Sequence, residues 1–162
     1  MKDHMHKDSL MKLNAANLDA FPETILRPRY DRADLRAGIV HIGVGNFHRG
    51  HQAWYLHRLM QQGLAHDWAI IGAGVRATDA TMRDKLLAQD CLTTLIELSA
   101  NSSGAEIIGS MIDFLPVEDD NAALIAQLAQ ADIRIVSLTV TEGGYFIHPA
   151  TKGFDATHPD IM

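Results

Sequence analysis

The sequence contains a single cysteine, Cys91, among its 162 residues. No internal disulfide can form, which excludes the disulfide-stapled secreted scaffolds. There are only 14 basic residues against 20 acidic ones, and aromatic residues make up 6%. This balance argues against a nucleic-acid binder and a polybasic membrane-surface protein. Trp54, Tyr55 and Trp68 are not interleaved with basic residues, so we expect them to pack in the core rather than stack on bases. No run approaches the ~18 apolar residues of a membrane-spanning helix, and the start lacks an apolar signal core, so we expect a cytoplasmic protein.

The rest of the composition is that of an ordinary globular protein, with 47% hydrophobic and 21% charged residues. The length fits one domain. The first residues are polar, and the steps Phe21-Pro22 and Arg27-Pro28 favour extended or turning chain. We therefore expect an N-terminal extension and arm over residues 1–37 and a folded domain over residues 38–162.

Apolar runs alternate with segments of helical periodicity along this domain. The runs at 38–44, 68–75, 91–98, 105–114 and 133–140 predict strands, and the segments 49–62, 77–89 and 118–130 predict helices. The cluster Asn101-Ser102-Ser103-Gly104 predicts a hairpin between two of the strands. The order predicts an α/β fold, a mostly parallel sheet with helices on both faces. Such sheets bind ligands at the carboxyl ends of their strands.

A glycine loop joins the first of these strands to the first helix. It reads Gly43-Val44-Gly45-Asn46-Phe47-His48-Arg49. In a dinucleotide fingerprint Gly43 would allow the tight turn, Gly45 would let the backbone approach a pyrophosphate, and the helix start would offer free N–H groups. The third glycine of the fingerprint would fall at position 48, where this chain has a histidine. Alone, the pattern fits a tight turn between buried elements equally well.

The fingerprint also places an acidic residue at the end of the second strand, where it binds ribose hydroxyls. Asp79 stands well beyond the usual ~20 residues after the first glycine. Spacing alone therefore favours a helix cap as the role of Asp79. A second glycine pair, Gly72 and Gly74, is interpreted as close packing at a strand end rather than as another phosphate loop.

Two further groups of residues give no catalytic or metal site. His48, His51 and His57 lack an acidic or cysteine partner at metal-ligand spacing, which indicates loop or packing histidines and no metal. Cys91 heads an apolar strand, where a buried, inert thiol is expected.

Four segments carry a more specific pattern. They are GIVHIGVGNFHRGHQAWY (38–55), DWAIIGAGVRATD (67–79), IIGSMIDF (107–114) and IVSLTVTEGGY (135–145). In order and spacing they resemble the N-terminal part of the long-chain mannitol dehydrogenase family of polyol and hexuronate dehydrogenases. The resemblance spans roughly residues 11–162, so that residues 1–10 look like an extension.

The resemblance implies a Rossmann-type cofactor domain that is followed in the family by a larger, mainly helical domain. The family transfers hydride between a secondary alcohol and a nicotinamide cofactor without zinc. In this chain Gly43, Gly45, Asn46 and Phe47 would lie along the pyrophosphate of the cofactor. Arg49 would be a structural or anion-facing residue of the same loop.

The resemblance also bears on the choice of cofactor. Asp79 matches the acidic residue that favours NAD over NADP, because a carboxylate repels a 2′-phosphate. Thr78 stands where some members carry a second acid, and Arg76 can tolerate a phosphate, so that NADP is not excluded. Ser137 and Thr139 close the last strand, where the ribose and nicotinamide side of the cofactor would pass.

The catalytic groups are only partly represented. Glu142, in TEGGY, matches a family glutamate that gates or relays protons near the active site, although without the resemblance it is read as a turn acid. The catalytic base of the family is a lysine, assisted by an asparagine and a histidine, in a segment that would follow Met162. Lys85 and Lys152 do not lie in that motif. We therefore expect the 162-residue chain alone to be inactive, and to self-associate through apolar surface that the absent domain would cover.

The implied function is the cofactor domain of an NAD-dependent polyol dehydrogenase, with a reaction such as D-mannitol + NAD+ to D-fructose + NADH + H+. Two alternatives stay open. One is a hexuronate reductase of the fructuronate or tagaturonate type, which acts on a sugar acid. The other is a truncated nucleotide-binding module without catalysis.

Overall fold

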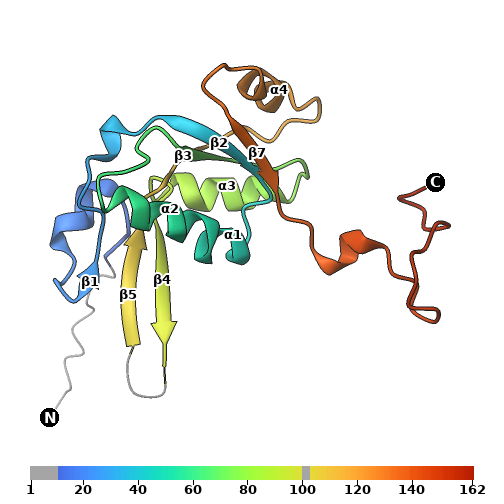
Figure 1. Ribbon diagram of the computed structural model, residues 1–162, viewed down its shortest axis with the longest axis horizontal. Helices are drawn as coiled ribbons and strands as arrows, with labels where there is room; N and C mark the ends of the chain where they lie inside the picture. Colours follow the sequence, from blue (N-terminus) through green and yellow to red (C-terminus); the bar gives the residue numbers. More distant parts are fainter. Residues whose placement is uncertain (1–10, 100–102) are drawn as a thin grey trace, which may run out of the picture.

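The computed structural model describes residues 11–99 and 103–162, so the predicted N-terminal extension and part of the hairpin turn lie outside the described residues. Four parallel strands form the main sheet in the order β6-β3-β2-β7 (Figure 1). They are β2 (Ala37–Ile42), β3 (Ala69–Ala73), β6 (Met111–Phe114) and β7 (Ile135–Leu138). The strand order reverses beside β2, because the chain moves from β2 outward to β6 and then returns to the other side of β2.

Helices connect these strands on both faces of the sheet. They are α1 (Asn46–Gly50), α2 (Gln52–Met60), α3 (Asp79–Leu87) and α4 (Ala122–Leu128). Figure 1 shows α1, α2 and α3 on one face and α4 on the other. Connections between parallel strands of one sheet are right-handed. Because the chain reverses its direction across the sheet between β6 and β7, the connection through α4 lies on the opposite face from the earlier helices. The predicted α/β fold with helices on both faces is confirmed.

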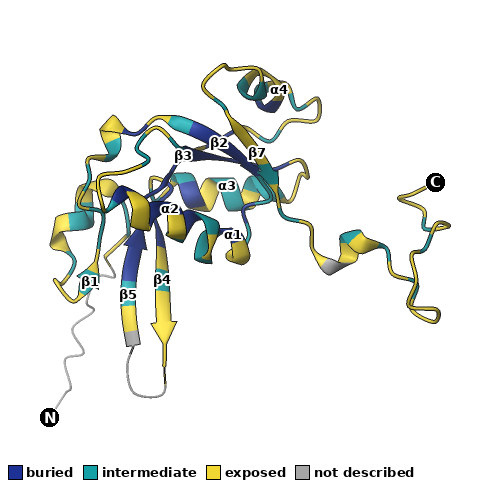
Figure 2. Cartoon of the chain, in the orientation of Figure 1, coloured by how far each residue is buried: buried dark blue, intermediate teal, exposed yellow. Residues whose placement is uncertain are grey.

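The two faces are held by separate apolar clusters. Ile39 and Ile70 lie in the cluster that includes Leu56 and Met60 of α2, whereas the next residues along β2 and β3 lie in the cluster that includes Leu124 of α4. This alternation follows from the two-residue period of a strand. Full burial of each such side chain contributes about 1.5–3 kcal/mol. Figure 2 shows the result, with β2 and β3 almost entirely buried.

A smaller sheet lies beside the first, in the order β1-β5-β4. Its strands are β1 (Ile25–Leu26), β4 (Thr93–Leu98) and β5 (Ser103–Ile108). The predicted antiparallel pairing of the last two is confirmed. The prediction of one continuous strand over 105–114 is wrong, because the chain divides between β5 and β6, which belong to different sheets.

An arginine from the N-terminal arm explains this division. Arg32 Nε donates to the Gly109 carbonyl oxygen at 3.1 Å, and its Nη2 donates to the Met111 carbonyl oxygen at 2.9 Å. A Cβ on Gly109 would lie 2.8 Å from Cγ of Pro28. The arm thus packs against the chain at the point where β5 ends and β6 begins. It also includes two 3₁₀ helices, η1 (Ala15–Ala20) and η2 (Arg32–Asp34).

Three local expectations also need correction. The helix predicted over 49–62 begins earlier, at Asn46, and is interrupted at His51, whose φ of −125° and ψ of −82° are not helical. The helix predicted over 118–130 is the shorter α4, because Asn121 before it adopts a left-handed φ of +54°. Tyr55, expected in the core with Trp54 and Trp68, is 59% exposed.

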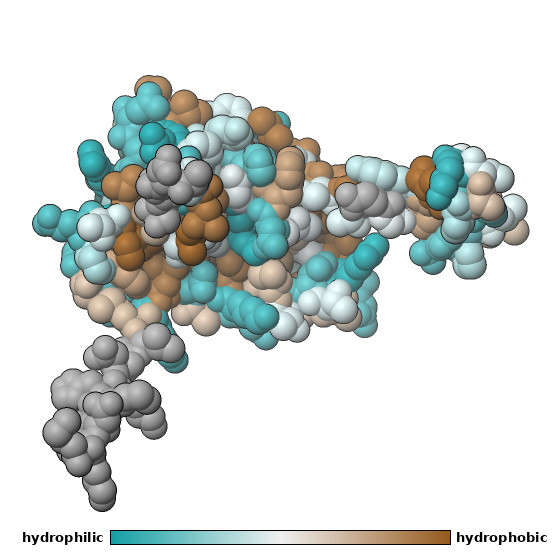
Figure 3. Space-filling model, turned by 90° about the horizontal axis from the view of Figure 1, so that it is seen from below, coloured by the Kyte–Doolittle hydropathy of each residue, from teal (hydrophilic) through white to brown (hydrophobic). Residues whose placement is uncertain are grey.

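After β7 the chain forms a third 3₁₀ helix, η3 (Glu142–Tyr145), and then leaves the body as an extended segment (Figure 1). Apolar side chains are exposed on β7 and along this segment, among them Val136, Leu138, Ile147 and Phe154. Figure 3 shows apolar surface on both the body and the segment. Within residues 11–99 and 103–162, no helix is long and apolar enough to cross a membrane.

Candidate functional site

A groove of about 660 Å³ opens at the carboxyl ends of β2, β3 and β7, where the strand order reverses. This is the position at which open parallel sheets bind their ligands. Five of the predicted site residues line it, namely Gly43, Gly45, Arg76, Asp79 and Thr139. Asn46, Phe47, Arg49 and Ser137 belong to the same loops or strands but are not among the residues that line the groove.

The glycine turn has the geometry that its sequence predicts. Gly43 has a φ of +88°, which L side chains rarely adopt, and its amide donates to the Ala73 carbonyl oxygen at 2.9 Å. A Cβ on Gly43 would lie 3.3 Å from the Thr139 carbonyl oxygen. Gly45 is the N-cap of α1, and a Cβ there would touch only the Gly43 carbonyl oxygen, at 3.9 Å. The backbone of Gly45 is therefore open to approach, and the first amides of α1 have no acceptor within the helix.

Arg49 braces this loop from within. Its Nη1 donates to the Val44 carbonyl oxygen at 2.9 Å, and its Nη2 donates to Oδ1 of Asn46 at 2.6 Å. Burial lowers the pKa of the Arg49 guanidinium from its ordinary value. Of the two predicted roles, this geometry favours the structural one. Phe47 is exposed and stacks on His51, with ring centroids 4.5 Å apart.

Asp79 is the first residue of α3 and holds the loop before it. Its Oδ2 accepts hydrogen bonds from the backbone amides of Val75 and Arg76, each at 3.0 Å. Within the described residues no hydrogen-bond partner appears for its second oxygen, and Asp79 lines the groove. Asp79 therefore does not cap α3, as spacing alone led us to expect, but holds the loop before the helix. The geometry also leaves a carboxylate oxygen for a ligand.

A polar group lies behind the groove, with His41 and His48 buried and Gln52, Ser137 and Thr139 half-buried. Sequence reasoning missed His41 and Gln52. His41 Nδ1 lies 2.8 Å from Ser137 Oγ, and His41 Nε2 lies 3.1 Å from Thr139 Oγ1. The His41 ring stacks on that of His48 at a centroid distance of 3.7 Å. His48 Nδ1 in turn lies 3.1 Å from Gln52 Oε1. The signal that was available is a histidine at position 41 inside an otherwise apolar strand.

Both imidazoles of this group are neutral at pH 7. Burial lowers the pKa of His48 to about 4, with a smaller contribution from the neighbouring His41. Burial also lowers the pKa of His41 from its ordinary value. The hydroxyl groups of Ser137 and Thr139 are directed at His41.

Glu142, the predicted proton relay, opens η3 beside Thr141 and Gly144, which line the groove. The structure thus brings its backbone to the end of the predicted site. Its role as a relay stays a prediction.

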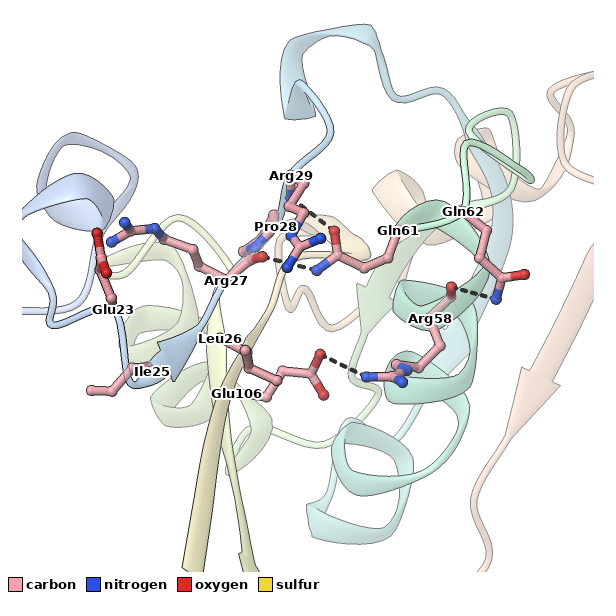
Figure 4. A pocket seen from close by; sticks show the side chains of 10 residues that line it. All are labelled: Glu23, Ile25, Leu26, Arg27, Pro28, Arg29, Arg58, Gln61, Gln62 and Glu106. Atoms are coloured by element: carbon pink, nitrogen blue, oxygen red, sulfur yellow. Dashed lines mark hydrogen bonds and ion pairs between the residues drawn. The ribbon is translucent and has the colours of Figure 1, made fainter.

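A second cavity, of about 490 Å³, lies between the arm, β5 and α2 (Figure 4). Its polar side chains mostly hold the arm in place. Gln61 donates to the Arg27 carbonyl oxygen and accepts from the Arg29 amide, each at 2.8 Å. Glu106 accepts from Arg58 at 3.3 Å. None of the predicted site residues lies there, so we take the groove as the candidate site.

The structure also shows where Cys91 and the remaining histidines lie. Cys91 is buried, and burial raises the pKa of its thiol to about 12, which leaves it unreactive. His48 and His57 are fully buried packing residues. Across the described residues there is no group of three side chains that could hold a metal ion.

Comparison with known proteins gives consistent matches. The mannitol dehydrogenase Rossmann domain family matches residues 37–161. The mannitol 2-dehydrogenase of Cereibacter sphaeroides is 60% identical over 139 residues, which cover 86% of this chain and 29% of that protein. The mannitol 2-dehydrogenase of Pyricularia oryzae is 48% identical over 148 residues, which cover 91% of this chain and 30% of that protein.

Two solved structures are also similar. One is Pseudomonas fluorescens mannitol 2-dehydrogenase in a ternary complex with NAD and D-mannitol, with a TM-score of 0.81 and 49% identity over 92% of this chain and 30% of that one. The other is D-sorbitol dehydrogenase in substrate-free form, with a TM-score of 0.74 and 36% identity over 90% of this chain and 30% of that one. The chain thus spans a little under a third of the length of these relatives.

Proposed function

Because the chain belongs to the mannitol dehydrogenase Rossmann domain family, we propose that it is the NAD-binding domain of a polyol dehydrogenase. The proposed reaction is D-mannitol + NAD+ to D-fructose + NADH + H+. The observation that carries the proposal is the groove at the strand reversal, lined by Gly43, Gly45 and Asp79. The similar mannitol 2-dehydrogenase from Pseudomonas fluorescens binds NAD and D-mannitol, which supports the same ligands for this protein.

The proposed cofactor contacts follow from the geometry of the glycine turn. Gly43 makes the turn possible, and the open backbone at Gly45 leaves space for a pyrophosphate. The first amides of α1, at Asn46 and Phe47, would donate to its oxygens. Arg49 would keep the loop in this shape through its bonds to Val44 and Asn46 rather than bind the anion.

The proposed preference for NAD rests on Asp79. Its uncommitted oxygen would accept a hydrogen bond from a ribose hydroxyl, and its charge would repel a 2′-phosphate. Arg76 stands beside it and Thr78 is uncharged, so binding of NADP is weakened rather than abolished. Ser137 and Thr139 would shape the wall along the ribose and nicotinamide side.

We propose that catalysis needs groups outside this chain. Bound NAD+ supplies the hydride acceptor. Oxidation of an alcohol also needs a base for the hydroxyl proton, and the lysine, asparagine and histidine that the family resemblance implies do not occur here. Glu142 would pass the released proton toward solvent. The proposal includes a zinc-independent reaction, a cytoplasmic location and a division into an arm (1–37) and a cofactor domain (38–162).

The hexuronate alternative has less support, since the relatives compared above are named for mannitol and sorbitol. Two experiments test the proposal and the remaining alternative of a non-catalytic module. Titration of the 162-residue chain with NADH, followed by nucleotide fluorescence, should show saturable binding; no binding at millimolar NADH would contradict the cofactor assignment. D-Mannitol oxidation by the same chain should be undetectable, whereas appreciable turnover would show that the base lies within it.

A further inference from the structure

A polar group of five residues lies behind the groove, with two buried imidazoles at its centre, and the proposed cofactor contacts do not account for these imidazoles. We propose that His41, His48, Gln52, Ser137 and Thr139 are positioning residues, which hold the glycine loop and α1 at a fixed separation from β7 and so set the shape of the groove. We refer to them as the histidine unit. The inference rests on the proposed function, because the ligand of the groove is taken to be NAD.

The first observation is the residue at the place of the third glycine. In the dinucleotide fingerprint a glycine there lets the helix pack closely against the strand. Position 48 carries a histidine instead, and the histidine is 1% exposed. It fits because the facing residue of β2, His41, presents another flat ring, stacked at 3.7 Å with an interplanar angle of 10°. The two stacked rings therefore set the distance between α1 and β2. In the dinucleotide fingerprint the helix instead packs directly against the strand.

The second observation is that the unit joins β7 to the glycine turn. His41 and Ser137 are register partners on neighbouring strands, and the His41 ring reaches both Ser137 and Thr139. The carbonyl oxygen of Thr139 is the atom that lies 3.3 Å from a Cβ placed on Gly43. A movement of His41 would therefore change the distance between the two walls that face the ligand.

The third observation is that the hydrogen bonds of the unit can be satisfied with both rings neutral. Gln52 Nε2 donates to Ser137 Oγ at 3.3 Å, and each ring nitrogen of His41 has a hydroxyl partner, Ser137 Oγ for Nδ1 and Thr139 Oγ1 for Nε2. A hydroxyl can donate or accept, so a neutral His41 finds one donor and one acceptor. His48 Nδ1–H donates to Gln52 Oε1. The remaining nitrogen, His48 Nε2, is buried and has no hydrogen-bond partner in the described part of the chain. As an unprotonated nitrogen it leaves no donor unsatisfied.

Protonation would disturb this pattern in two ways. A proton on His48 Nε2 would add a buried N–H without an acceptor. A second proton on His41 would make both of its ring nitrogens donors, so that neither Ser137 nor Thr139 could donate to the ring. Two charged rings would also repel each other across 3.7 Å. The charged group that acts on His48 from α1 is Arg49, also a cation, whereas α2 and β7 contribute only neutral side chains to the unit. No carboxylate acts on either ring within the described residues.

The test measures NADH affinity by fluorescence titration with the intact protein. His48→Ala removes the stacked ring, and His48→Gly restores the third glycine of the fingerprint. We expect both to weaken binding at pH 7.5 by about tenfold, which corresponds to the loss of one to two buried hydrogen bonds. The matched control is His57→Ala, which removes an equally buried histidine of α2 that contacts Tyr30 and Glu106, and should leave the affinity within about twofold. Unchanged binding by His48→Ala or His48→Gly would overturn the proposal.

A pH series separates positioning from simple packing. Because burial lowers the pKa of His48 to about 4, the affinity of the wild-type protein should change little between pH 7 and pH 5 and should fall by about twofold at pH 4, while circular dichroism reports a folded protein. His48→Phe keeps an aromatic ring on His41 but removes a titrating nitrogen. Its affinity at pH 7.5 should stay within about threefold of wild type, and its pH dependence should be shallower. A His48→Phe profile as steep as that of wild type would contradict the role given to His48.

A second measurement does not depend on the cofactor. Amide hydrogen exchange at residues 43–46 and 137–139 should become faster in His48→Ala and stay unchanged in His57→Ala. If the wild-type protein failed to bind NADH, the proposed function would be wrong, and this measurement alone would then judge the histidine unit. Equal exchange in the wild type and in His48→Ala would overturn the inference.

Discussion

The side chain of Asp79 lies directly over Gly74, so that a Cβ on the glycine would overlap Cβ of the aspartate. The same aspartate holds the amides of Val75 and Arg76. The glycine that the sequence places at the end of β3 is therefore what allows an acidic side chain to stand at the rim of the groove. The interpretation of Gly74 as a position of close packing is confirmed.

We predict that Asp79→Ala raises the affinity for NADP relative to NAD by about tenfold, because it removes the charge that repels a 2′-phosphate. The ratio of the two dissociation constants is the quantity to measure. Asp79→Asn is the control for the loop, since its amide oxygen can still accept from the amides of Val75 and Arg76. The asparagine should shift the ratio as well, but with less loss of thermal stability. An unchanged ratio in both variants would remove the assigned role of Asp79.

Gly43→Ala should lower the free energy of unfolding by about 1–2 kcal/mol, because an L side chain is strained at a φ of +88°. Its Cβ would also press on the Thr139 carbonyl oxygen. Gly104→Ala is the matched control, since a Cβ there meets no atom within 4 Å. Urea denaturation of the two variants compares them directly. Equal midpoints would show that the turn is not restricted to glycine.

The stability of the fold should depend on pH through the buried histidines. Because the pKa of His48 in the folded protein is about 4, below the ordinary value of 6.5, the unfolded chain binds more protons between these two values. The stabilisation is complete above pH 6.5 and is lost as the pH falls toward 4, by on the order of 3 kcal/mol for His48 alone. Denaturation at pH 7.5 and pH 4.5 measures the loss. His48→Phe should reduce the difference, and a difference as large as that of wild type would contradict the assignment.

Arg32→Ala should lower the free energy of unfolding by about 2–3 kcal/mol, because it leaves the carbonyl oxygens of Gly109, Met111 and Asp90 without their donor. Arg36→Ala, an exposed arginine of the same arm, is the control and should change the stability by less than about 0.5 kcal/mol. Thermal denaturation distinguishes the two. Similar melting temperatures for both variants would mean that Arg32 does not hold the arm to the junction of β5 and β6.

The exposed apolar edge of β7 leads us to predict self-association of the 162-residue chain. Val136 is 52% exposed on a strand whose outer side pairs with no other described strand. Light scattering should show species larger than a monomer at high concentration. Val136→Lys should shift the distribution toward the monomer. A monomeric wild-type chain at every concentration would refute the prediction.

The parts of the fold that local sequence determines were predictable. Ile39, Val40 and Ile42 mark β2 as a buried strand, and the glycine turn after it follows from the residue types themselves. The division at Gly109 was not predictable, because the cause is Arg32, which lies 77 residues earlier in the sequence.

The site shows the same limit. Gly43, Gly45 and Asp79 could be proposed from motifs, and the resemblance to a known family supplied most of their meaning. The pairing of His41 with His48 could not be proposed from the sequence, because it depends on the rotation of α1 above β2. A histidine in an apolar strand indicates a buried partner but does not identify it.

The position of β2 between β3 and β7 has a consequence for how the protein folds. The pairing of β2 with β3 joins neighbouring parts of the chain, whereas His41 and Ser137 meet across 96 residues. Long-range parallel pairing carries a high loop-closure entropy and is slow. We expect β7 to dock last, onto a preformed layer of β6, β3 and β2. One wall of the groove belongs to β7 and the loop after it, so the ability to bind a ligand would appear only in that final kinetic phase.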